Sequence, residues 1–199
     1  MTVQTLGYYE VNDGGNAEYL IKASSTNYYE ELNNGLVAEL IVDKIVNVNQ
    51  LGAYGDGIHD DTSVVQKAFD NFENIEFVAN KTYIINGVIT NKYLNINGNN
   101  ATLKSSNNCD YILKSYSTNN KYNGIIKDLT FDGNNYALDC ILNDDSFRRV
   151  YKNIRLNNPR NNGSGFHQIN RGGGTRLESI NGYQTNMTLD TTFIKIEGP

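Results

Sequence analysis

The chain has 199 residues and a formal net charge of −5. Its lysines and arginines are scattered apart from the pair Arg148 and Arg149, so the sequence excludes a typical nucleic-acid-binding protein, which needs a clustered basic face. Two cysteines, Cys109 and Cys140, are too few for a disulfide framework or a zinc site of the usual spacing.

Asparagine supplies much of the polarity, at about one residue in six. Asparagine tolerates left-handed backbone and forms side-chain turns, and stacked asparagines can form hydrogen-bonded ladders. This composition therefore favours a protein with many turns and repeated stacking.

The first fifty residues are expected to form a separate unit. Residues 6–9 and 18–22 are short strand-like runs, and the turn sequence 12–15, Asn-Asp-Gly-Gly, between them predicts a β-hairpin. A further apolar run, residues 36–48, is interrupted by Asp43 and Lys44 and predicts two more short strands.

A glycine-rich turn and a short helix come next. Residues 52–62 contain three glycines and end in Asp60-Asp61-Thr62, in which either aspartate can accept N–H bonds at a helix start. Apolar residues then recur at helical spacing on one face up to Phe72.

After Asn74 the apolar pattern has a period of two, and an internal repeat follows. Residues 127–133 align with 152–158 about 25 positions later, and residues 178–182 continue at a similar step. A repeat of this length without helices predicts coils of a parallel β-solenoid, in which like side chains stack from coil to coil. Two stacks are expected: Leu129, Ile154 and Ile180, and Phe131 with Leu156.

The expected fold is therefore all-β: a small module followed by a parallel solenoid. Residues 1–48 are assigned to a small N-terminal β module, and residues 49–199 to a helix followed by the first coils. A solenoid end exposes unpaired strand edges, so we expect the amphipathic helix to cap it.

Residues 51–62, with Val65, Gln66 and Ala68 after them, resemble the first-turn motif of pectate-lyase-like proteins. The family pattern is Gly-Ala-x-Gly-Asp-Gly, a spacer, Asp-Asp-Thr, and a helix with Gln and Ala. The resemblance implies a right-handed, single-stranded parallel β-helix. Residues 77–85 are similar to the family's first strand, with Ala-Asn in place of the usual Pro-Gly.

Residues 5–9 and 13–19 resemble the small module that precedes this β-helix in bacteriophage tail spikes and pre-neck appendages. That resemblance implies a homotrimer in the virion, with other tail proteins and host cell-surface polysaccharide as partners. Members are much longer, and residues 193–196 look like the middle of a coil, so we expect either a piece of a longer chain or a short member.

Carbohydrate-active β-helices carry charged side chains on an outer face of the coils, where carboxylates can protonate a leaving oxygen or activate water. The candidates in this sequence are Asp132, Asp139, Asp144, Asp145, Arg148, His167 and Arg171. Of these, the substrate-binding set is expected to be Asp132, Arg148, His167 and Arg171, and no catalytic residue is assigned.

His167 is expected to point outward from a strand on which Phe166 points inward, although an ordinary surface histidine is the commoner case. Asp144 and Asp145 are neighbours, so on a strand they would face opposite sides and could not form a carboxylate pair. Exposed tyrosines offer another route to sugar stacking or to a protein interface: Tyr8, Tyr9, Tyr28, Tyr29, Tyr116, Tyr122 and Tyr136.

Asp56, His59, Asp60 and Asp61 could be mistaken for a metal site, but turn formation and helix capping explain aspartate at these positions. No metal or cofactor is expected.

Three functions stay open. The leading hypothesis is a virion appendage that binds host polysaccharide, with degradation of that polysaccharide left open. The alternatives are a stand-alone carbohydrate-active lyase or hydrolase and a structural virion connector. No segment resembles a signal peptide or reaches the ~20 apolar residues of a membrane span. We therefore expect synthesis in the host cytoplasm without a membrane partner, and release of the virion by lysis.

Overall fold

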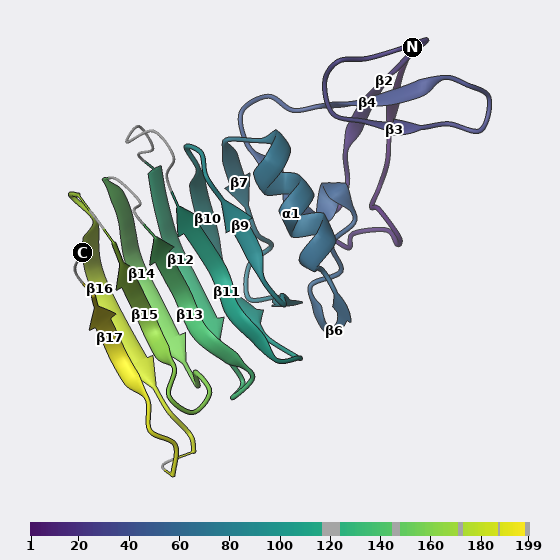
Figure 1. Cartoon of the computed structure of the whole chain (residues 1–199). Helices are drawn as coiled ribbons and strands as arrows, with labels where there is room; N and C mark the ends of the chain where they lie inside the picture. Colours follow the sequence, from purple (N-terminus) through teal and green to yellow (C-terminus); the bar gives the residue numbers. More distant parts are fainter. Residues whose placement is uncertain (117–123, 145–147, 171–172, 187, 198–199) are drawn as a thin grey trace.

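The computed structural model describes residues 1–116, 124–144, 148–170, 173–186 and 188–197. Most of them form strands that stack in parallel into a β-solenoid of about five turns. Figure 1 shows a small separate sheet at one end of the solenoid, helix α1 (Thr62–Asn71) beside the first coils, and β16 and β17 at the other end.

The N-terminal sheet is antiparallel, with the order β1-β2-β4-β3. Its strands are β1 (Thr2–Gln4), β2 (Glu18–Lys22), β3 (Tyr29–Glu31) and β4 (Val37–Ile41). The predicted hairpin is wrong in one arm, because β2 pairs with β1 and residues 6–9 form no strand.

The physical reason is the Asp13 side chain. Its carboxylate accepts backbone N–H bonds from Tyr8, Tyr9 and Glu10 at 2.8–3.1 Å and from Gly15 at 2.7 Å. These bonds curl residues 8–15 around one carboxylate, which removes the N–H groups that a strand would need.

The same loop joins the N-terminal sheet to the solenoid. The Asp13 carbonyl oxygen accepts hydrogen bonds from Lys81 Nζ at 2.9 Å and Asn49 Nδ2 at 3.2 Å. Tyr19 and Leu40 of the sheet belong to the same buried apolar cluster as the solenoid core, so one core runs through both parts.

The larger solenoid sheet has the order β16-β14-β12-β10-β7-β5; in addition, β8 pairs with β10, and β6 pairs with β8. The second sheet has the order β17-β15-β13-β11-β9. The strands of the larger sheet are β5 (Val46–Asn47), β6 (Asp56–Asp60), β7 (Asn74–Glu76), β8 (Thr82–Ile84), β10 (Asn95–Lys104), β12 (Gly124–Asp132), β14 (Arg149–Asn157) and β16 (Arg176–Tyr183). The short 3₁₀ helix η1 (Val48–Leu51) follows β5. The second sheet consists of β9 (Val88–Thr90), β11 (Cys109–Tyr116), β13 (Ala137–Asp144), β15 (Ser164–Ile169) and β17 (Thr192–Ile196). Parallel pairing begins at Val46, just before the boundary expected at residue 49.

The predicted repeat is confirmed as the register of the larger sheet. Leu129 lies opposite Ile154, which lies opposite Ile180, and Phe131 lies opposite Leu156. Leu129, Phe131, Ile154 and Leu156 are at most 2% exposed, so each apolar side chain rests on its counterpart in the next coil.

Left-handed residues bend each coil at the same place. Asp128, Asn153 and Ser179 have φ values of 56°, 52° and 54°, and each lies between matched register positions of β12, β14 and β16. Asn153 Nδ2 donates to Asp128 Oδ1 at 2.7 Å and so links two of these bends. The richness in asparagine therefore has the structural use that the sequence suggested.

The glycine-rich turn is held by Asp61, which is fully buried. Its carboxylate accepts N–H bonds from Tyr54 at 2.7 Å and Gly55 at 3.2 Å, and makes no side-chain hydrogen bond at the start of α1. Asp60 Oδ1 instead accepts the Thr62 N–H at 2.8 Å. Of the two aspartates expected as caps, Asp60 binds the helix N–H and Asp61 fixes the turn.

Helix α1 confirms the predicted helical segment. Val65, Ala68 and Phe69 are buried in the core cluster, while the opposite face is exposed. The helix contacts β9 and η1. Within the described residues, no helix is long and apolar enough to cross a bilayer.

We predict that Ile154→Ala lowers the free energy of unfolding by about 2–5 kcal/mol, because it leaves a cavity between two stacked neighbours. Urea denaturation measures this loss. Ile58→Ala is the control, since the Ile58 side chain is 81% exposed, and it should change stability by less than about 0.5 kcal/mol. Equal effects of the two substitutions would contradict the stacking.

A second prediction concerns Asp13. Its burial raises the pKa, but the four backbone donors outweigh this and lower it from 3.8 to about 2. The folded pKa is below the unfolded one, so the carboxylate stabilises the fold above about pH 4, and this contribution is lost as the pH falls towards 2.

Asp13→Ala should therefore destabilise the protein by about 1–2 kcal/mol at pH 7 and by progressively less between pH 4 and pH 2. Thermal unfolding across this pH range measures the difference from wild type. The control is Asp43→Ala, since Asp43 is exposed. A loss of stability in Asp13→Ala that stays constant down to pH 2 would contradict the role given to the Asp13 carboxylate.

Candidate functional site

Of the predicted substrate-binding residues, the described ones, Asp132, Arg148 and His167, lie in three different places. Asp132 ends β12, and its Oδ1 accepts hydrogen bonds from Asn134 N at 3.0 Å and Asn158 Nδ2 at 2.9 Å. Arg148 precedes β14 and is exposed at the opposite end of the same strand pair, since Gly124 pairs with Arg149 and Asp132 pairs with Asn157. Through its hydrogen bond from Asn158, the Asp132 carboxylate links two neighbouring coils of the solenoid. Arg171 and Asp145 lie outside the described residues.

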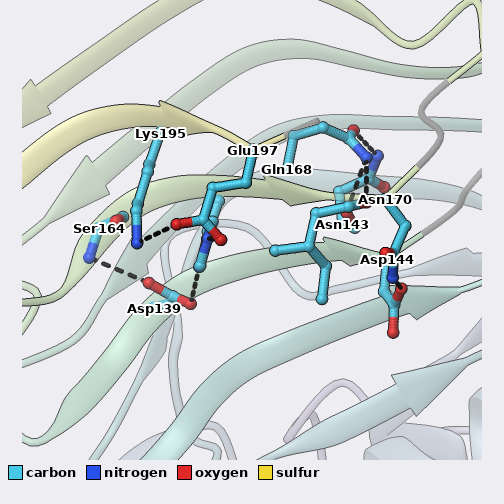
Figure 2. A network of polar contacts seen from close by, with 10 residues as sticks. Asp139, Asn143, Asp144, Ser164, Gln168, Asn170, Lys195 and Glu197 are labelled. Atoms are coloured by element: carbon cyan, nitrogen blue, oxygen red, sulfur yellow. Dashed lines mark hydrogen bonds and ion pairs between the residues drawn. The ribbon is translucent and has the colours of Figure 1, made fainter. Parts of the chain in front are cut away.

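His167 belongs to the other sheet and is the centre of a charged network there. It follows the buried Phe166 and is partly exposed, as predicted. Its Nδ1 lies 2.7 Å from Asp139 Oδ2, and its Nε2 lies 3.2 Å from Glu197 Oε2. Figure 2 shows Asp139, Ser164, Lys195 and Glu197 of this network on the adjacent strands β13, β15 and β17 and the residue after β17.

The two carboxylates differ in environment. The Asp139 side chain is only 5% exposed, and burial raises its pKa despite the hydrogen bonds from His167 and from Ser164 N at 3.0 Å. Glu197 is exposed, and its pKa is lowered by Lys195, 2.7 Å away, and by His167.

This arrangement can hold and transfer a proton. The His167 ring lies between two carboxylates, with Asp139 at Nδ1 and Glu197 at Nε2. Asp139 fixes the ring orientation from the buried side, and the exposed Glu197 can move away from Nε2. A His167 ring freed on that side could exchange a proton with a bound molecule.

Asp144 lies on the same sheet in a separate ion pair. It contacts Lys114 Nζ at 3.0 Å and accepts from Asn170 Nδ2 at 2.7 Å. Burial acts to raise the pKa of Asp144, but these two partners lower it overall. The Asp144 carboxylate is thus satisfied by the coils next to it.

A groove with a largely apolar lining lies on the larger sheet, near the amino-terminal ends of β12, β14 and β16. Two adjoining cavities, of about 560 and 490 Å³, share Tyr93, Asn95 and Ile125. The other lining residues are Ile45, Asn74, Ile75, Ile96, Asn97, Lys127 and Lys152 in the first cavity, and Gly124, Arg148, Val150, Gly174 and Arg176 in the second.

The groove combines an oriented aromatic ring with amides and cations. Tyr93 is 38% exposed, and its hydroxyl accepts from Asn95 Nδ2 at 2.8 Å. Glu178 partly neutralises the rim through contacts with Lys152 at 4.0 Å and Arg176 at 2.5 Å. Lys127 lies 3.7 Å from Asp128. Arg148 has no ion pair with a described residue, so the groove keeps basic character on a chain of net charge −5.

Sequence reasoning found Arg148 but missed the rest of this groove. Lys127 and Lys152 are the first residues of the two aligned repeats, and they lie side by side in the structure. That alignment could have predicted a stacked lysine pair. Tyr93 and Ile125 lie outside the repeat, so only the folded arrangement shows that they share the groove.

The cluster around Asp56 is a side-chain turn at the start of β6. Asp56 Oδ1 accepts the N–H groups of Ile58 and His59 at 2.9 and 3.0 Å, and Oδ2 lies 2.7 Å from His59 Nδ1. Tyr54 stacks between His59 and Tyr9, with 4.1 Å between ring centroids on each side. No group of three or more His, Cys, Asp or Glu side chains among the described residues could hold a metal.

The tyrosines expected at the surface differ in exposure. Tyr8, Tyr9, Tyr29 and Tyr136 are exposed. Tyr28 and Tyr116 are half-buried, and Tyr122 lies outside the described residues.

The fold and these surfaces define a mostly β protein with a parallel solenoid, whose two sheets carry a basic groove and a histidine–carboxylate network. A scan against protein-family models and a search of curated proteins both return no match to this chain.

Proposed function

We propose that this chain is part of a bacteriophage tail spike or appendage, and that it binds host cell-surface polysaccharide in the groove around Tyr93. The observation that carries the proposal is the groove itself: two adjoining cavities that share a partly exposed tyrosine and are bordered by amides and cations. The motifs at residues 51–62 and 5–19 support the viral part of the proposal.

The chemistry of the groove fits an acidic oligosaccharide. A tyrosine ring offers an apolar face for a sugar ring, and the asparagine amides can bind hydroxyl groups. Arg148 and Lys127 at the rim suit carboxylates or other anionic substituents. Because the cavities adjoin, the ligand would extend over more than one sugar.

The finer features of the fold belong to the same proposal. We infer a right-handed, single-stranded solenoid in which α1 caps the first coil, since its buried face of Val65, Ala68 and Phe69 joins the core. Residues 1–48 would attach the chain to other virion proteins. The assembly would be a homotrimer in the virion.

Tyr93→Ala and Arg148→Ala should each weaken binding of an acidic host polysaccharide by about 5- to 30-fold, through loss of ring stacking or of one charge-assisted contact. Isothermal titration with purified host polysaccharide measures the change. Binding by wild type should also weaken with added salt, since the charged contact is partly exposed.

The matched controls are Tyr136→Ala and Arg155→Ala, which remove an exposed tyrosine and an exposed arginine that do not line the groove. Both should bind as wild type does. Equal losses in variants and controls, or no binding by wild type, would count against the groove.

The second candidate function is a stand-alone lyase or hydrolase, and the Asp139–His167–Glu197 network favours it. A histidine oriented by a buried carboxylate is a common proton-transfer group, and the exposed Glu197 supplies a second carboxylate beside it. The same network could cleave polysaccharide within a virion appendage.

If the chain is an enzyme, His167→Gln should reduce the release of reducing ends or unsaturated uronate by about 10²- to 10⁴-fold. His59→Gln is the matched control, because His59 also contacts an aspartate at 2.7 Å but lies in the Asp56 turn. If the wild-type chain releases no product, or if His167→Gln and His59→Gln release equal amounts, His167 is not the catalytic group.

A further inference from the structure

Arg149 is a buried arginine whose charge has no carboxylate partner among the described residues. It heads the fully buried side chains by volume, at 0% exposure. Its Nη2 donates to the Lys92 carbonyl at 2.9 Å, while Nε and Nη1 have no hydrogen-bond partner in the described part of the chain. Burial lowers the pKa of Arg149, which reflects the cost of keeping a cation out of water.

The alternation of the strand explains why this arginine points inward. Arg148 is exposed in the groove, whereas Arg149 and Tyr151 of β14 are buried, with Val150 between them less buried. Arg149 therefore shares the interior side of the coil with Tyr151, whose hydroxyl donates to Asn143 Oδ1 at 2.9 Å.

The interior here is polar over several coils. Thr90, Ser115, Asn143 and Gln168 occupy matched register positions of β9, β11, β13 and β15, and all four are buried. Asn143 and Gln168 bond to each other across the coils, as Figure 2 shows. These residues are neutral, so they cannot balance the guanidinium charge.

A second buried polar atom without a partner in the described chain belongs to this polar interior, on β9. Thr90 Oγ1 is buried without a hydrogen-bond partner among the described residues, and Thr90 is two residues before Lys92, whose carbonyl Arg149 contacts. The N–H groups of Nε and Nη1 can only donate, and the Thr90 hydroxyl can donate as well, so an acceptor between them could satisfy these groups together.

We propose that Arg149 and Thr90 hold a small monovalent anion of the halide class inside the solenoid. Water could accept from the same donors, but it would leave the buried positive charge uncompensated, which is unfavourable in a low-dielectric interior. An anion meets both requirements. The site is independent of the surface groove and of the proposed binding of polysaccharide.

The first test is thermal unfolding of the full chain in sodium bromide against sodium gluconate at equal ionic strength, since gluconate is too large for a halide site. Above its dissociation constant, each tenfold rise in bromide should raise the wild-type midpoint by roughly 3–5 °C relative to gluconate. Arg149→Met should abolish this increment. Arg155→Met, which removes an exposed arginine from the same strand, should keep it.

The second test needs no variant and covers the case in which Arg149→Met does not fold. Crystals of the wild-type chain grown in sodium bromide should give one anomalous peak within about 3.5 Å of an Arg149 nitrogen. Ordered water alone at Nε and Nη1, or a carboxylate of the chain against the guanidinium, overturns the proposal. So does a bromide increment that is the same in Arg149→Met as in wild type.

Discussion

The structure depends on one constraint: each coil must place its inward side chains directly on those of the coil before it. The stack Leu129, Ile154 and Ile180 meets this condition only because every coil bends at the same step. Left-handed residues at Asp128, Asn153 and Ser179 make the bends, at little cost for asparagine and aspartate. Stacking and turn chemistry therefore support each other, and an extra residue in one coil would shift both.

The same constraint decides what the outer surface can do. Because the inner positions are fixed by stacking, function is left to side chains that point outward and meet their counterparts one coil away. Lys127 and Lys152 gather cations in this way on the larger sheet. On the second sheet, Asp139, His167 and Glu197 come from three successive coils, so the charged network exists only when those coils are in register.

The sequence predicted the repeat, the helix and the inward Phe166, because periodicity and turn residues act over short distances. It failed at residues 6–9, where an apolar run resembled a strand. The Asp13 carboxylate binds the backbone N–H groups there, and such a side-chain bond leaves no periodic signal. The groove could not be read from the sequence, because Tyr93 reaches it from outside the repeat. Asp132, expected to bind substrate, accepts a hydrogen bond from Asn158 of the next coil.

The adjacent arginines show why composition alone misleads in a solenoid. Arg148 and Arg149 look like one basic pair, but a strand turns consecutive side chains to opposite sides. One arginine reaches the groove and can meet a ligand in water, while the other enters a polar interior where its charge must be balanced. Two identical neighbouring residues thus have opposite environments, one in water and one buried. The position at which the strand begins decides which arginine points outward and which points inward.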